Sequence, residues 1–220
     1  MTFRLPYCPQ EDEKLRATAL KVRRGGNCPN SLEVLQQLTP LQIPDSNNHS
    51  PKLHLVSPLP HPDSPAVQAI ARSFSTEATL VDLSTCLYRP ESREAASCYI
   101  MRSAQTGSRT IVTYNELREM DVDEFNEVAE KARRLGGKQW WHFEGRIPPT
   151  TLHCIELLRN NAPQDSLVIS VEVEKPGRDG LEAVAASADV VFISRNWAER
   201  NAHIVSYSGS QSAKAHGSVL

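Results

Sequence analysis

The sequence predicts an α/β fold in which a mostly parallel sheet carries an appended β-hairpin. Helical and short apolar segments alternate regularly from about Asp121 onward, which is typical of a parallel sheet covered on both faces. Two β-rich segments, residues 98–101 and 110–114, flank the polar segment 103–108 and predict the hairpin. With 220 residues, the chain can form one large domain or two small ones.

In the first part of the chain, the spacing of apolar residues predicts two helices and a strand. Residues 30–38 predict a helix that begins near Pro29 and carries leucines on one side. Residues 53–56 predict a strand, and Ser64 with Pro65 can begin a second helix. Residues 43–51 are polar and rich in turn-forming residues, and seven of the fifteen prolines lie between Pro40 and Pro65. This Pro-rich stretch predicts a loop or an insertion.

The second part predicts three helices between short strands. Asp123 can cap a helix that Gly136 and Gly137 end, and Pro148 with Pro149 can begin the next one. A short third helix is expected over residues 179–186. Strands are expected over residues 140–143, 167–173 and 189–193, the last of them buried. Residues 201–220 lack periodicity and predict a flexible tail.

Composition excludes several classes of protein. The formal net charge is -2, which gives no reason to expect a nucleic acid or an anionic membrane as partner. The sequence has no apolar run long enough to span a bilayer, and its first residues lack the apolar stretch of a signal peptide. The five cysteines are widely spaced and form no C-x-x-C pair, so a reducing cytoplasm is the expected setting.

The segment from Arg24 to Asn30 is the first candidate binding site. Two glycines allow close approach of a ligand to the backbone, and the carboxamides of Asn27 and Asn30 can both donate to and accept from the hydroxyls of a polyol. A turn followed by an ordinary helix cap explains the same residues, and on spacing alone this second interpretation is the commoner one.

Three polar clusters follow predicted strands. They are Glu144-Gly-Arg146, the carboxylates of residues 171–176, and Asn196-Trp-Ala-Glu199. Each cluster alone is explained by a helix cap or a solvated loop. Together they favour a site, because ligands of open parallel sheets bind outside the carboxyl ends of the strands. Arg109 on the hairpin joins this site only if the hairpin folds over it.

The remaining histidines and tryptophans give weaker signals. Trp140 and Trp141 are adjacent on one strand and therefore point to opposite faces, which favours packing. His49, His54 and His61 match no metal-ligand spacing.

Taken in chain order, these motifs resemble those of the pfkB (ribokinase-like) carbohydrate kinases, most closely the ketohexokinase or fructokinase branch. The set comprises Arg24-Gly-Gly-Asn-x-x-Asn30, Gly107-Ser-Arg-Thr-Ile-Val112, Trp141-His-Phe-Glu-Gly-Arg146, Ser170-Val-Glu-Val-Glu-Lys-Pro176 and Asp189-Val-Val-Phe-Ile-Ser194. The resemblance implies a ribokinase-like, doubly wound, mostly parallel sheet with a small β lid. It places a partial kinase domain over residues 1–200, with lid elements at about 1–26 and 96–114.

The resemblance also implies an activity and its site. It implies a cytoplasmic kinase that uses ATP and Mg²⁺ to phosphorylate a ketohexose such as fructose at a primary hydroxyl. Substrate-binding roles fall on Gly26, Asn27, Asn30, Asp12, Glu144 and Arg146. Roles near the nucleotide phosphates fall on Arg109, Asn196 and Glu199, with Glu199 also toward the metal. Asp12 and the lid further imply a homodimer through the β lid.

One family motif has no counterpart in this sequence. The Gly-Ala-Gly-Asp motif, whose glycines form the anion hole and whose aspartate is the catalytic base, occurs nowhere in the 220 residues. No catalytic residue is therefore assigned. We expect a fold that is incomplete toward the C-terminus and little turnover by this chain alone; the alternative is a non-catalytic sugar-binding or dimerising protein.

Overall fold

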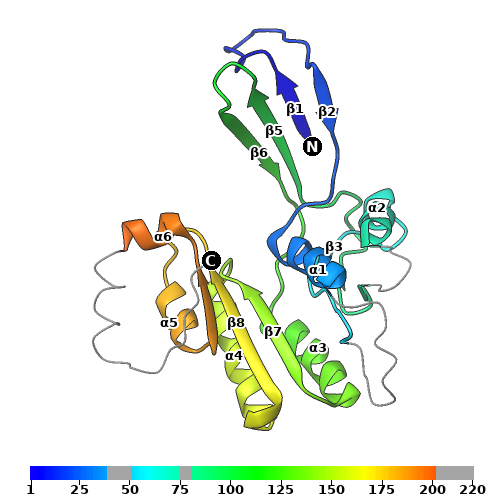
Figure 1. The fold of residues 1–220 in the computed structure, drawn as a ribbon. Coiled ribbons are helices and arrows are strands. Elements are labelled where there is room, and N and C mark those ends of the chain that lie inside the picture. The colour runs from blue at the N-terminus through cyan, green and yellow to red at the C-terminus, as the bar shows by residue number, and fades with distance from the viewer. Residues whose placement is uncertain (39–50, 75–80, 202–220) are drawn as a thin grey trace. The chain divides into compact units, whose positions relative to one another are not determined.

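The computed structural model describes residues 1–38, 51–74 and 81–201, and the predictions for the Pro-rich loop and for the tail fall largely outside them. The chain divides into two compact units, Met1–Met120 and Asp121–Leu220. Figure 1 shows the elements of each unit.

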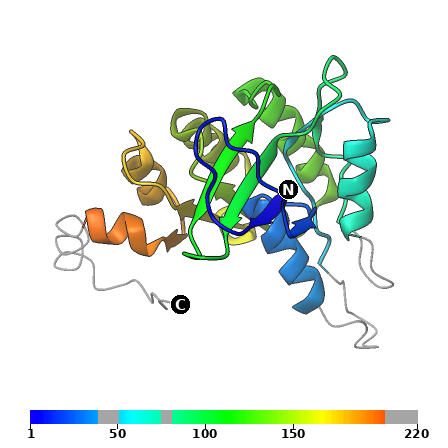
Figure 2. The same cartoon turned by 90° about the horizontal axis from the view of Figure 1, so that it is seen from above.

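A four-stranded mixed sheet stands in the first unit, where the resemblance places the lid. Its strand order is β2-β1-β5-β6. The members are β1 (Thr2–Leu5), β2 (Ala19–Lys21), β5 (Ser97–Ser103) and β6 (Arg109–Tyr114). β5 and β6 form the antiparallel hairpin that the sequence predicts, and both views show them side by side (Figures 1 and 2). β1 lies parallel to β5, so residues almost a hundred positions apart become neighbours.

The rest of the first unit packs two helices and two short strands around an apolar core. The elements are α1 (Asn27–Leu38), β3 (Pro58–Leu59), α2 (Pro65–Phe74) and β4 (Leu87–Tyr88). Ser64 caps α2 as predicted, because its Oγ accepts from the backbone N–H of Val67 at 3.2 Å. Phe74, 1% exposed, joins Leu55 and Leu59 in the core.

The second unit is a three-stranded parallel sheet with helices between the strands. The sheet order is β7-β8-β9, formed by β7 (Gln139–Glu144), β8 (Leu167–Val173) and β9 (Val190–Ile193). The helices are α3 (Val122–Leu135), α4 (Pro148–Asn161), the 3₁₀ turn η1 (Gln164–Ser166), α5 (Leu181–Ala186) and α6 (Arg195–Arg200). This alternation confirms the predicted parallel α/β pattern.

Aromatic packing fixes one face of this sheet. Phe125 of α3 lies 5.3 Å from Trp141 and 5.7 Å from Phe143, measured between ring centroids. On the opposite face Trp140 and Phe192 are 65% and 51% exposed among the described residues. Trp141 thus packs against α3 on the opposite face from Trp140, as their alternation predicts. The packing expected for Trp140, and the expectation of a sheet covered on both faces, are wrong for the described residues.

Several predicted boundaries are corrected. The cap of α3 is Asp121 rather than Asp123: the Asp121 carboxylate accepts from the N–H of Glu124 at 2.9 Å, and Glu124 accepts in return from the N–H of Asp121. α1 begins at Asn27 rather than Asn30, so both asparagines lie inside the first helical turn.

Two predicted strands are also corrected. Residues 53–56 make a single parallel bridge, His54 to Asp82, instead of a strand. Among the described residues, β9 is an edge strand whose Ile193 is 47% exposed, so it is not the buried strand that its apolar sequence predicts.

No helix in the described part of the chain is long and apolar enough to cross a membrane.

Candidate functional site

The Gly25–Gly26 turn delivers the chain into α1. Gly26 has φ +97°, a left-handed conformation that glycine adopts without a side-chain clash. A Cβ at this position would lie 3.1 Å from the ring of Pro29. The N–H of Asn30 donates to the carbonyl of Gly26 at 3.0 Å, which closes the first turn of the helix. Glycine here is therefore required by the backbone path.

Arg24 anchors this turn to α2. Its side chain is only 6% exposed, and its guanidinium lies 4.2 Å from the centroid of the Phe74 ring. Nε donates to Ser73 Oγ at 2.8 Å, while Nη2 pairs with the half-exposed carboxylate of Glu33. This single guanidinium joins α1 to the end of α2. Arginine suits this role better than lysine, because its planar guanidinium has five N–H donors that can reach several partners at once.

The same guanidinium orients Asn30. Arg24 Nη1 donates to Asn30 Oδ1 at 3.3 Å. Because the amide oxygen accepts from arginine, its NH₂ group is left as the donor toward a ligand. The motif identified in the sequence includes Arg24, but no role was predicted for it; the available signal was an arginine directly before the glycine pair.

Asp12 lies in the loop that joins β1 to β2. It is exposed and is the non-glycine residue with positive φ, +62°, in the described part of the chain. The loop is held by Glu13, whose carboxylate accepts from Tyr7 Oη at 2.5 Å and from the N–H of Gln10 at 2.9 Å. These two hydrogen bonds hold the pKa of Glu13 below its ordinary value, and the bond between Tyr7 and Glu13 raises the pKa of Tyr7. Asp12 is thus presented on a structured loop.

In the second unit, Glu144 and Arg146 lie at the carboxyl end of β7, on either side of Gly145. The N–H of Gly145 donates to the carbonyl of Glu172 at 3.0 Å, and Arg178 Nη1 donates to the carbonyl of Gly145 at 2.6 Å. A Cβ at Gly145 would lie 2.5 Å from that Glu172 oxygen. The glycine therefore permits the close approach of β7 and β8 that positions its two polar neighbours.

The ends of β8 and β9 are tied together by Ser194. Its Oγ donates to the carbonyl of Glu174 at 2.5 Å and accepts from the N–H of Trp197 at 3.1 Å, which caps α6. Trp197 is buried, whereas Asn196 and Glu199 on the same helix are exposed. The three strand ends thus share one edge of the parallel sheet, as the sequence predicts.

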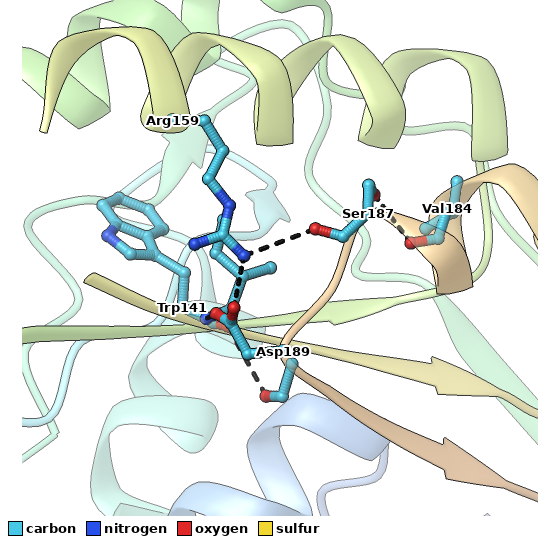
Figure 3. A network of polar contacts seen from close by, with 7 residues as sticks. Trp141, Arg159, Val184, Ser187 and Asp189 are labelled. Atoms are coloured by element: carbon cyan, nitrogen blue, oxygen red, sulfur yellow. Dashed lines mark hydrogen bonds and ion pairs between the residues drawn. The ribbon is translucent and has the colours of Figure 1, made fainter. Parts of the chain in front are cut away.

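An ion pair fixes the start of β9 (Figure 3). Arg159 Nη2 donates to Asp189 Oδ1 at 2.7 Å, and Asp189 Oδ2 accepts from the N–H of Ile169 at 2.7 Å. Partial burial by itself would raise the pKa of Asp189, but the hydrogen bonds from Arg159 and Ile169 outweigh it, so the pKa lies below its ordinary value. The pair links α4, β8 and the start of β9.

The predicted residues divide between the two units. Gly26, Asn27, Asn30, Asp12 and Arg109 belong to the first unit, and Glu144, Arg146, Asn196 and Glu199 to the second. Their convergence in one cleft stays a prediction.

Within the described ranges, no three His, Cys, Asp or Glu side chains gather closely enough to hold a metal ion. Glu199 is an exposed lone carboxylate. A magnesium ion commonly takes one or two protein carboxylates and completes its shell with substrate phosphates and water. Glu199 is therefore compatible with such a shell but does not build a metal site by itself.

Known proteins are similar to this chain in sequence and in fold. No protein-family model matches the chain. Mouse ketohexokinase is 28% identical over 196 residues, which cover 87% of this chain and 58% of that enzyme. The chain is therefore similar to the pfkB carbohydrate kinases. The resemblance drawn from the motifs is thereby confirmed.

Solved structures show the same fold. Phosphofructokinase-2 from Escherichia coli in complex with fructose-6-phosphate matches with a TM-score of 0.60 at 12% identity, over 94% of this chain and 66% of that one. Fructokinase from Xylella fastidiosa matches with a TM-score of 0.55 at 12% identity, over 96% and 64%. The chain therefore has a mixed α/β, ribokinase-like fold and spans about three fifths to two thirds of the length of these relatives.

Proposed function

We propose that this chain binds a ketohexose such as fructose and supplies the sugar-binding part of an ATP-dependent carbohydrate kinase. The observation that carries the proposal is the turn from Arg24 to Asn30, in a chain related to ketohexokinase over most of its length. Proteins of this class transfer a phosphoryl group to a primary hydroxyl, a reaction that depends mainly on positioning and charge neutralisation.

The sugar site is proposed to form around the first turn of α1. Gly26 lets the backbone approach the ligand, and Asn27 and Asn30 present carboxamides from a helix start. Asn30 offers its NH₂ group, because Arg24 occupies its oxygen. Asp12 adds a carboxylate, which accepts from hydroxyls, and Glu144 and Arg146 complete the polar lining.

The nucleotide side of the proposal rests on fewer residues. Arg109 would neutralise phosphate charge, and Asn196 with Glu199 would hold the magnesium and phosphate shell. Bound Mg²⁺-ATP supplies the phosphoryl group. The 220 residues hold no Gly-Ala-Gly-Asp sequence to provide the base and anion hole, so we expect this chain alone to bind sugar without appreciable turnover.

This last point favours a second candidate, a sugar-binding or dimerising protein without catalysis. It keeps the Asn27 and Asn30 turn and the four-stranded sheet, through which a homodimer is proposed. All five cysteines are free thiols, which suits the cytoplasm proposed as its compartment.

Titration calorimetry with fructose tests the sugar site. We expect binding by the native chain and at least a tenfold loss in Asn30→Ala, because one charge-oriented hydrogen bond is removed. Asn126→Ala, an exposed asparagine on α3, is the matched control and should bind normally. Equal binding by both variants would refute the site.

A coupled ADP-release assay with fructose, ATP and Mg²⁺ then separates the two candidates. Turnover at ordinary kinase rates, on the order of 1–100 per second, would show that a base exists elsewhere in the chain. Fructose binding without turnover would support the proposal as stated.

A further inference from the structure

Three arginines lie in register across the four-stranded sheet. Arg4 of β1 is the direct neighbour of Arg102 of β5, and Arg102 is the direct neighbour of Arg109 of β6. Direct neighbours on adjacent strands project from the same face of a sheet. Lys21 of β2 pairs with Thr2, two positions from Arg4, and so lies on that same face. All four cationic residues are exposed.

This arginine row, Arg4, Arg102 and Arg109, has no compensating carboxylate in the described part of the chain. By contrast, Arg133 is paired with Glu130 and Arg159 with Asp189, each at 2.7 Å. Side chains of direct cross-strand neighbours stand roughly 5 Å apart, and like charges at that separation destabilise a sheet. The like charges in the two successive pairs therefore repel each other, and a bound anion would reduce this repulsion.

Two members of the row, Arg4 and Arg102, border a hollow at the sheet, and Arg109 lies outside it. Arg4, Lys21 and Arg102 line it together with Thr2 and Gly107, and its volume is about 370 Å³. That volume suits a small ligand rather than a polymer. Gly107, with φ +71° and open space where a Cβ would be, leaves the rim of the hollow clear.

We propose that this hollow binds a small phosphate-bearing anion with at least two negative charges. Guanidinium groups bind phosphate oxygens through pairs of parallel hydrogen bonds. The two guanidiniums and the Lys21 ammonium that line the hollow match a short polyphosphate or a sugar phosphate. A nucleic acid is disfavoured by the overall charge of -2 and because only Arg4, Lys21 and Arg102 gather at this hollow. Arg109, which the proposed function uses, lies in the row but outside the hollow, and the proposal needs neither sugar binding nor turnover.

Inorganic tripolyphosphate and fructose 1-phosphate are the two probes, each titrated into the full chain by calorimetry. We expect at least one of them to bind, and Arg102→Gln, at the centre of the row, to weaken it tenfold or more. Preference for tripolyphosphate identifies a polyphosphate chain as the ligand, and preference for the hexose phosphate identifies a sugar phosphate. Arg16→Gln removes an exposed arginine of the β1–β2 loop and is the charge-matched control.

Thermal unfolding gives a second measurement, in which the loss of the Arg102 charge is expected to raise the melting temperature although it weakens anion binding. Without anion, Arg102→Gln should melt higher than the native chain, because it relieves two like-charge pairs; with tripolyphosphate, only the native chain and Arg16→Gln should gain stability. Arg4→Gln repeats the test if Arg102→Gln fails to fold.

The proposal is overturned by three results: no binding of either probe, an equal loss in Arg16→Gln, or tighter binding of a short oligonucleotide than of tripolyphosphate. Fructose titrated into the same variants keeps the two proposals separate. A variant that still binds fructose but no longer binds the anion bears only on the anion site at the arginine row and leaves the proposed sugar site unaffected.

Discussion

Replacing Arg24 by methionine should destabilise the first unit by about 2–3 kcal/mol. The hydrogen bond to Ser73 contributes about 1 kcal/mol, and the guanidinium over the Phe74 ring contributes about 1 kcal/mol at a mostly buried position. The pair with Glu33 adds roughly 0.5 kcal/mol, because that carboxylate is 46% exposed and is rehydrated when the arginine is removed. Methionine keeps part of the packing against the ring.

Urea unfolding followed by far-UV circular dichroism measures this loss, and hydrogen exchange in the peptides of α1 and α2 localises it. Arg23→Met, its exposed neighbour, is the control and should change stability by less than about 0.5 kcal/mol. Arg24→Lys should fall between the native chain and Arg24→Met, since an ammonium cannot serve all four partners. A loss below about 1 kcal/mol in Arg24→Met, or unchanged exchange in α1, would refute the anchoring role.

Three further changes address the second unit. Gly145→Ala should cost about 2–3 kcal/mol in urea unfolding, because its Cβ would lie 2.5 Å from the carbonyl oxygen of Glu172. Asp189→Ala should cost about 1–3 kcal/mol at neutral pH by losing hydrogen bonds to Arg159 and to the backbone; since the folded pKa of Asp189 is depressed, the native advantage should disappear as pH falls below about 4. Burial lowers the pKa of His142, against an opposing effect of a nearby carboxylate. As the pH falls, the unfolded chain therefore binds a proton at this histidine before the folded chain does. The free energy of unfolding of the native chain should decrease at pH values below about 6.5, and that of His142→Gln should depend less on pH.

Each of these has a distinct contrary result. A native-like melt of Gly145→Ala would mean that β7 and β8 can separate at no cost. If the stability of Asp189→Ala changed with pH in parallel with that of the native chain through the acid range, the ion pair would not contribute to the stability of β9. An identical slope for His142→Gln between pH 6.5 and 5 would assign that slope to other groups.

The sequence predicted the elements that local patterns specify. The helices over residues 122–135 and 148–161 and the strand over 167–173 follow from hydrophobic periodicity and from Gly and Pro at their ends. Errors arose where two local signals compete. Asp121 and Asp123 both suit an N-cap, and only Asp121 has a glutamate three residues later to complete the capping box.

The site features that sequence could not predict depend on long-range pairing. Arg4 becomes the neighbour of Arg102 only because β1 joins β5 in parallel, a register that no local pattern encodes. Arg24 meets Ser73 and Phe74 across almost fifty residues. The exposure of Phe192 is likewise invisible in sequence, since a run of apolar β-branched residues predicts burial whether or not another layer covers it.

The division of the predicted residues between the two units gives a way to decide what the chain does. Of the proposed sugar-binding residues, those of the turn before and within α1 and Asp12 lie in the first unit, whereas Glu144 and Arg146 lie in the second, with Asn196 and Glu199. A kinase must couple the two, so fructose should raise the affinity for Mg²⁺-ATP, and Mg²⁺-ATP should raise that for fructose by the same factor. A sugar-binding protein has no such coupling, because its nucleotide residues would serve no ligand. Calorimetric titration of fructose with and without Mg²⁺-ATP therefore tests the kinase assignment through binding alone, and a coupling factor of one at saturating nucleotide would favour the non-catalytic alternative even if fructose binds tightly.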